Sequence, residues 1–145
     1  GEALQPEFKS YCQKIIDNAQ ILSDTLLSLG YDLVSGGTDT HVILIDLTST
    51  SVTGKKAEIT LEHAGITTNK NMVPFDERSP MITSGIRIGT PAMTTRGMGS
   101  DEMVKIAHLI YNVIQNIDDE KVISSTKSEV TELCNTFPLY ESQLV

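Results

Sequence analysis

The chain has 145 residues, of which 39% are hydrophobic and 21% charged, and its formal net charge at pH 7 is -8. This length suits one domain with a substantial core, and no apolar run approaches the roughly 18 residues that span a bilayer. The acidic balance and the low aromatic content of 5% argue against nucleic acid as a partner, because phosphate binding needs a basic face and base stacking needs aromatic side chains. We therefore expect a single domain over residues 1–145 that binds neither nucleic acid nor a membrane.

The first predicted element is a long helix over residues 1–29. Apolar residues recur at steps of three and four from Leu4 to Leu29, which is the spacing of one helical face, and Gly30 provides a C-terminal stop. The chain starts with Gly rather than Met, and Leu4 already keeps the helical phase ahead of Pro6. We therefore expect this helix to enter from a longer protein.

Two predicted strands follow, at residues 31–35 and 41–47. The second, H-V-I-L-I-D-L, is apolar on both faces, which predicts a central place in a sheet. Thr53 is then expected to cap a short helix that runs to about His63. Residues 66–69 form a third candidate strand.

The pattern breaks over residues 70–83, where K-N-M-V-P-F-D-E-R-S-P-M-I-T has two prolines and no period. A loop of this length in a compact domain is usually functional or disordered. A short strand, G-I-R-I-G, follows, and Ser100 and Asp118 are then expected to cap two closing helices. This order of elements predicts an α+β fold, in which helices pack on a small, mostly antiparallel sheet.

The two cysteines and three histidines show no spacing typical of metal ligands, so we expect no metal site. Cys12 and Cys134 lie on apolar helical stripes, which favours buried, reduced thiols in a cytoplasmic protein. His41 lies inside a strand pattern, where a packed, hydrogen-bonded imidazole is favoured over a catalytic one.

Positive charge is concentrated in one segment of this acidic chain. Residues 69–99 hold four bases and two acids, whereas the rest of the chain holds seven bases and seventeen acids. A local cationic island of this kind is better explained by a small anionic ligand than by a polyanion.

Two arginines in this island are candidate anion ligands. On a strand, Arg87 points away from Ile86 and Ile88, and an arginine fork on the face opposite the core is shaped to hold a carboxylate through two hydrogen bonds. An arginine that reaches solvent or closes an internal salt bridge remains an equal alternative for Arg87. For Arg96, a structural arginine bonded to backbone carbonyls is the stronger alternative.

Four stretches and the closing helices carry a resemblance to a known family. The stretches are E-A-L-Q-P-E-F-K, G-Y-D-L-V-S-G-G-T-D-T-H, I-T-T-N-K-N-M-V-P and S-P-M-I-T-S-G-I-R-I-G-T-P-A-M-T-T-R-G. The last of these is highly specific to the serine hydroxymethyltransferases, whose C-terminal domain the chain resembles over essentially its whole length. The resemblance implies the small domain of a fold-type I pyridoxal-phosphate transferase. That enzyme, a homodimer or homotetramer, moves a one-carbon unit between serine or glycine and tetrahydrofolate.

The resemblance also implies roles for single residues. Arg87 matches the arginine that binds the carboxylate of the serine or glycine substrate, and Arg96 matches a second arginine that we assign to support of the site.

Several residues match the folate site of the family. Asn71 matches the asparagine that hydrogen-bonds the pterin ring. The segment of Ser79, Pro80 and Met81 matches a folate-lining S-P-F segment, with Met81 in place of the aromatic residue. Lys70 and Arg78 flank this loop and are weaker candidates for contact with the glutamate tail of folate.

Part of the family pattern is not in this sequence. The 145 residues lack the T-T-T-H-K segment, whose lysine binds the cofactor covalently, and the histidine and aspartate that contact the pyridine ring. We therefore expect the chain to be roughly the last third of such an enzyme, with no catalytic residue and no pyridoxal phosphate bound to it alone. The alternative is a free-standing module that binds amino acids or folate.

Overall fold

The computed structural model describes residues 5–139 and confirms an α+β fold. In chain order the elements are α1 (Pro6–Ser28), β1 (Asp32–Leu33), a 3-10 turn (Val34–Gly36), β2 (Val42–Asp46), α2 (Gly54–His63), β3 (Asn69–Asn71), β4 (Gly85–Gly89), α3 (Pro91–Thr95), α4 (Ser100–Gln115) and α5 (Glu120–Thr136). The strands form one antiparallel sheet in the order β1-β2-β4-β3. The predicted central place of β2 is thus confirmed, and β4 is its central neighbour.

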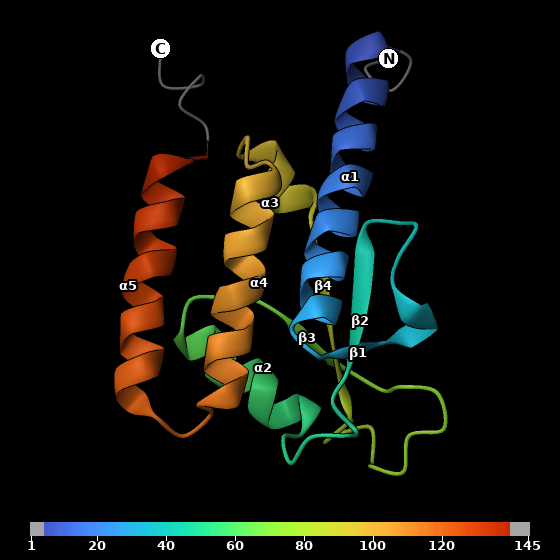
Figure 1. Ribbon diagram of the computed structural model, residues 1–145, viewed down its shortest axis with the longest axis vertical. Helices are drawn as coiled ribbons and strands as arrows, with labels where there is room; N and C mark the ends of the chain where they lie inside the picture. The colour runs from blue at the N-terminus through green and yellow to red at the C-terminus, as the bar shows by residue number, and fades with distance from the viewer. Residues whose placement is uncertain (1–4, 140–145) are drawn as a thin grey trace.

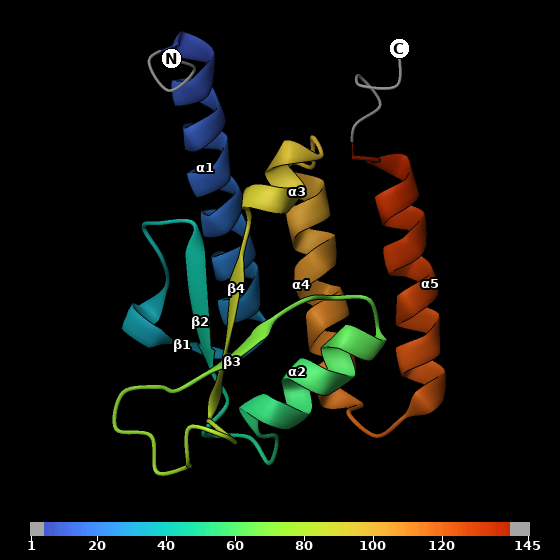
Figure 2. The same cartoon turned by 180° about the vertical axis from the view of Figure 1, so that it is seen from behind.

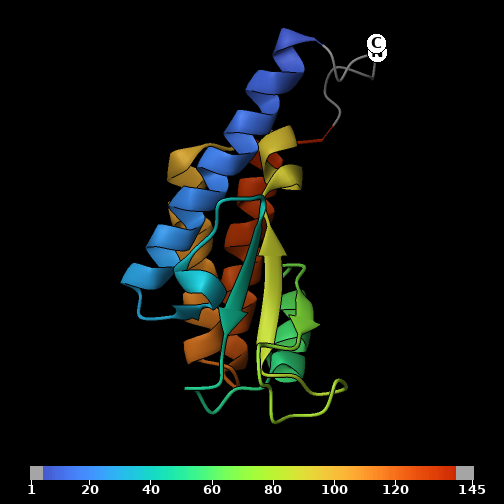
Figure 3. The same ribbon diagram turned by 90° about the vertical axis from the view of Figure 1, so that its right-hand side faces the viewer.

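The helices cover one face of this sheet. Ile43 and Ile45 in β2, and Ile86 and Ile88 in β4, are buried in the main core, and Figure 3 places α1 and α4 on one side of these two strands. We call the other side the open face. Strand alternation and the pairing register assign to it Asp32, Val42, Leu44, Asp46, Asn69, Asn71, Gly85, Arg87 and Gly89.

Helix α1 runs past the sheet and packs along α4 (Figure 1). It is also tied to the segment that follows β4. The Thr90 hydroxyl donates to the carbonyl of Ile15 over 2.8 Å, and the buried Asn18 amide donates to Thr94 Oγ1 at 2.9 Å and to the Met98 carbonyl at 3.1 Å. The threonines of this segment therefore fix it to α1, in addition to shaping a turn.

The bounds of three predicted elements need correction. The first helix begins at Pro6 within the described residues, whereas Leu4 lies outside them. The strand predicted at 31–35 is reduced to β1, because Ser35 has a φ of 65° and the chain turns there. The strand predicted at 66–69 lies instead at Asn69–Asn71, because Ile66 still bonds to the end of α2.

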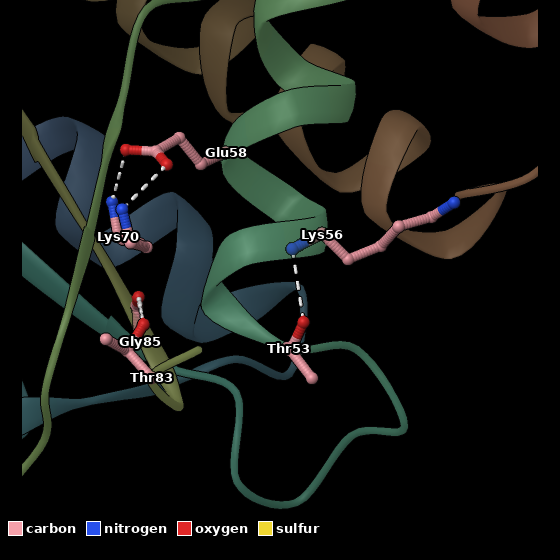
Figure 4. A network of polar contacts seen from close by, with 6 residues as sticks. All are labelled: Thr53, Lys56, Glu58, Lys70, Thr83 and Gly85. Carbon is pink, nitrogen blue, oxygen red and sulfur yellow. Dashed lines mark hydrogen bonds and ion pairs between the residues drawn. The ribbon is translucent and has the colours of Figure 1, made fainter. Parts of the chain in front are cut away.

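Two predicted helix caps are each displaced by one residue. The N-cap of α4 is Gly99, whose amide donates to the Glu102 carboxylate at 2.8 Å, so Ser100 is the first helical residue. The N-cap of α5 is Asp119 rather than Asp118. Its carboxylate accepts two amides of the first turn, at 2.9 and 3.3 Å, as N-cap side chains do. The predicted cap of α2 is confirmed, because Thr53 Oγ1 accepts from the amide of Lys56 (Figure 4).

The predictions for cysteine and histidine are met only in part. Cys12 and Cys134 are free thiols, but both are half-buried rather than buried. His41 is exposed and precedes β2, so the expected packed imidazole is wrong. Among residues 5–139, no three His, Cys, Asp or Glu side chains gather as a metal site would need, and no helix is long and apolar enough to cross a membrane.

Gly54 provides a test of the packing between α2 and the start of β4. A Cβ at this position would fall on Thr83 Oγ1 and on the carbonyl oxygen of Gly85, two groups that lie side by side in Figure 4. We expect Gly54→Ala to lower the free energy of unfolding by about 3 kcal/mol, as severe overpacking against backbone does. Urea unfolding measures this change.

Gly99→Ala is the matched control, because its Cβ would meet nothing closer than 3.7 Å. Its expected cost is below about 1 kcal/mol, the loss of a favourable N-cap residue. Equal costs for the two variants would contradict the packing argument.

Candidate functional site

Arg87 lies at the centre of β4 and points to the open face, as the alternation of β4 predicts. Its side chain is exposed, while Ile86 and Ile88 on either side are buried. Its cross-strand neighbours are Leu44 on β2 and Asn69 on β3. Within residues 5–139 the guanidinium has neither an ion pair nor a hydrogen bond, so it has not closed the internal salt bridge that was one alternative, while its exposure agrees with the other, an arginine that reaches solvent. Its five N–H donors therefore remain available to an anion from outside the described residues.

Asn71 lies on the same face as Arg87 and close to it. It pairs with Gly85, two residues before Arg87 on β4, so the two side chains are diagonal neighbours, about 7–8 Å apart at the backbone. Asn71 Nδ2 donates one hydrogen bond of 2.9 Å, to the carbonyl of Met72. The remaining amide hydrogen and the amide oxygen have no partner within residues 5–139 and keep their capacity for a ligand.

The loop between β3 and β4 is organised by Asp76, which sequence reasoning missed. The two oxygens of its carboxylate accept from the Arg78 amide at 2.9 Å, the Val73 amide at 3.3 Å, the Ser84 amide at 2.8 Å and the Ser84 hydroxyl at 2.6 Å. The hydrogen bond from the Ser84 side chain, followed by those from the backbone amides, lowers the pKa of Asp76 to about 2. One carboxylate thus joins the two ends of the loop.

The predicted folate-lining segment lies in this loop. Ser79, Pro80 and Met81 are all exposed, and Met81 is 70% exposed. Ser79 also closes a turn, because its carbonyl accepts from the amides of Ile82 and Thr83 at 2.9 Å each. The segment is therefore an exposed turn with a fixed backbone. The chain runs from this turn directly into β4, the strand that contains Arg87.

The two cations that flank this loop already have partners. Lys70 points to the helix side of the sheet, where its ammonium lies 3.5 Å from the Glu58 carboxylate and its amide donates to the same group at 2.9 Å (Figure 4). The Arg78 guanidinium donates to the carbonyl of Val52 at 3.2 Å. Contact of either residue with a glutamate tail would have to replace or share these interactions.

Arg96 is not at the open face. Its Nη1 donates to the carbonyls of Phe137 at 2.9 Å and Cys134 at 3.4 Å, at the C-terminal end of α5. This is the backbone-bonded arginine that the sequence left as the stronger alternative. The structure brings Arg87 and Asn71 together and leaves Arg96 on the helix side of the sheet.

Comparisons with known proteins identify the family of the chain. A family model described as serine hydroxymethyltransferase matches residues 1–110, which include β4 and both arginines. The chain belongs to the serine hydroxymethyltransferase family. The serine hydroxymethyltransferase of Paramagnetospirillum magneticum (strain ATCC 700264 / AMB-1) is 51% identical over 97% of this chain. The chain spans 34% of the length of that relative.

The family resemblance does not point to Asp76 as a functional residue. The resemblance identifies residues that contact a ligand, whereas the carboxylate of Asp76 accepts hydrogen bonds from backbone amides of the protein itself. The sequence did contain a signal, since an aspartate in a proline-containing loop often accepts from the backbone amide two residues on, as Asp76 does from Arg78. The serine hydroxymethyltransferase domain thus contains a loop organiser beside its candidate ligand residues.

The low pKa of Asp76 predicts how the stability of this loop depends on pH. The folded pKa of about 2 lies below the ordinary 3.8, so the carboxylate stabilises the folded state above about pH 4, and this contribution is lost as the pH falls toward 2. Asp76→Asn should therefore lower the melting temperature at neutral pH, and the gap to the parent chain should shrink between pH 4 and 2. Thermal unfolding monitored by circular dichroism across this range measures the gap.

Glu77→Gln is the control for this experiment. Glu77 is the exposed neighbour of Asp76, and its side chain has no hydrogen bond or ion pair with any of residues 5–139. Its melting temperature should follow that of the parent chain at every pH. A gap for Asp76→Asn that stays constant down to pH 2 would show that the carboxylate charge does not matter.

Proposed function

We propose that this chain is the C-terminal domain of an enzyme that interconverts serine plus tetrahydrofolate and glycine plus 5,10-methylenetetrahydrofolate. Arg87 carries the proposal, because its guanidinium is unpaired in the described residues and its side chain is exposed at the centre of the open face. Membership of the serine hydroxymethyltransferase family supports the same reaction. On the resemblance alone, the parent enzyme is a cytoplasmic homodimer or homotetramer.

In this proposal Arg87 binds the carboxylate of serine or glycine. Two parallel N–H···O bonds from the planar guanidinium fix both the position and the orientation of the carboxylate. The paired strands on both sides of β4 hold the backbone of Arg87, so little order has to be gained when the substrate binds.

Folate is proposed to bind beside Arg87, at Asn71 and the turn of Ser79, Pro80 and Met81. The free donor and acceptor of the Asn71 amide suit the edge of a pterin ring, which presents both kinds of group. The exposed Met81 side chain supplies an adaptable apolar contact in place of an aromatic ring. Asp76 positions this turn through its hydrogen bonds to both ends of the loop.

Arg96 is proposed to support the site without contact to the substrate. Its bonds to the end of α5 hold the C-terminus of α3, and α3 follows β4 after one residue, Thr90. Loss of these bonds should therefore affect the stability of the domain more than the affinity for an amino acid.

The residues described here do not fit a covalent site for pyridoxal phosphate. None of the strand positions that share the open face with Arg87 is a lysine, and Lys70 lies on the other face in contact with Glu58. We therefore propose that the cofactor is held by the part of the parent enzyme that this chain does not include.

A chimera tests the role of Arg87. Residues 1–145 would replace the matching third of the Paramagnetospirillum magneticum enzyme, and glycine binding would be measured by titration. Loss of one partner of a buried, hydrogen-bonded charge pair costs about 2–5 kcal/mol, roughly 30- to several-thousand-fold in affinity. We expect Arg87→Lys to weaken glycine within this range, because lysine replaces the planar fork by a point charge.

Arg96→Lys is the matched control in the same chimera. It should lower the melting temperature while glycine affinity stays within about threefold of the parent, since Arg96 lies on the other side of the sheet. If Arg96→Lys lost glycine and Arg87→Lys did not, the two assignments would be exchanged.

The 145-residue chain alone provides a second test. Without the lysine segment it should form no site-specific, borohydride-reducible bond to pyridoxal phosphate and should not turn over serine. Absorbance after addition of the cofactor, followed by mass spectrometry of the reduced chain, measures this. A specifically labelled lysine would contradict the proposal, and tight binding of glycine or folate by the chain alone would favour the free-standing module.

A further inference from the structure

A cavity of about 400 Å³ lies on the helix side of the sheet, away from the open face. It forms where β3 is too short to cover β4. Strand β3 pairs only with Gly85, Ile86 and Arg87, so the end of β4 has no strand on that side and lines the cavity through Ile88 and Gly89. Figure 2 shows the surrounding elements, with α3 above, α5 beside and the start of β3 below.

The wall of this cavity is mostly apolar. Helices α3, α4 and α5 contribute most of the lining side chains, among them Met93, Ile106, Leu109, Val130 and Leu133. Its volume falls within the range of small-molecule sites, about 300–1,000 Å³. At about 30 Å³ for each group of the size of a water molecule, it holds on the order of a dozen heavy atoms.

Arg96 is the one charged residue among the described residues that line the cavity. Only its Nη1 is engaged, by the carbonyls of Cys134 and Phe137. A guanidinium has five N–H donors, so those on Nε and Nη2 have no acceptor within residues 5–139. In a protein with a net charge of -8, an apolar cavity with a single arginine selects for a negative group.

We propose that this cavity binds a small amphipathic carboxylate, with the carboxylate on Arg96 and an apolar tail of about eight carbons between α4, α5 and the end of β4. The apolar wall supplies affinity in proportion to the area of the tail that it buries. The arginine fork selects a carboxylate over a neutral head group, because its unpaired N–H donors match the two carboxylate oxygens. The site is distinct from the open face and does not depend on the proposed function.

Octanoate and octan-1-ol are the probes that test this proposal. They share a tail and differ in the charge of the head group, and both can be titrated into the 145-residue chain while ¹H–¹⁵N NMR shifts report the site. Hydrogen bonds to a charged group are stronger than those to a neutral one, so octanoate should bind at least about tenfold more tightly than octanol. The largest shifts should fall on α3, α5 and residues 65–67.

Variants separate recognition of the charge from burial of the tail. Arg96→Leu should weaken octanoate about tenfold, to the affinity of octanol, and leave octanol unchanged. Ala92→Phe, at an exposed position of α3 that lines the cavity, should weaken both probes. Arg87→Leu is the matched control and should change neither, since Arg87 lies on the other face.

Equal affinities of the parent chain for octanoate and octanol would overturn the proposal, and this comparison stands even if Arg96→Leu fails to fold. Loss of octanoate binding in Arg87→Leu, or shifts confined to the open face, would assign the carboxylate to the other arginine. Retention of full octanoate affinity by Ala92→Phe would show that the cavity is not the site.

Discussion

The position of Arg87 depends on the burial of two isoleucines. Ile86 and Ile88 lie against the helices, and because side chains alternate along a strand, their burial forces the residue between them to the other face. Pairing with β2 on one side and β3 on the other then fixes this strand in the sheet. The apolar core thus determines where the cation lies, and the cation gains no partner from the protein described here.

Several charged side chains in the segments around β4 bind partners within the protein, whereas Arg87 binds none of the described residues. Asp76, Lys70 and Arg78 are engaged by amides, a carboxylate or a carbonyl of the protein itself, and Arg96 holds the end of α5. By contrast, the guanidinium of Arg87 has no partner within residues 5–139, and the side-chain amide of Asn71 has only one, the carbonyl of Met72. This difference is what separates the candidate ligand residues from the residues that position them.

Much of the fold was predictable because it depends on local patterns. The apolar stripes predicted the long helices, and the G-I-R-I-G alternation predicted both the strand and the outward direction of Arg87. The register of β3 was not predictable, since it depends on pairing with β4 rather than on its own sequence, N-K-N. The caps at Gly99 and Asp119 were displaced because the choice among adjacent capping residues depends on which side chain reaches the amides. The sequence favoured a backbone-bonded role for Arg96 but could not name its partner, Phe137, which lies 41 positions away. The role of Asp76 was missed because it depends on contacts such as that with Ser84, 8 positions away.

The glycines that bound β4 limit how this segment can change during evolution. A side chain at Gly85 would meet Val73 Cγ1 at 2.7 Å and the Asn71 carbonyl at 2.9 Å, so the strand cannot slide along its neighbours to bring a larger residue to that position. A shift of one residue would also exchange the two faces and bring the guanidinium into the core. Insertions and deletions are therefore compatible with the loop before β4 but not with the five residues Gly85–Gly89 themselves. The length of this strand should stay constant among related proteins.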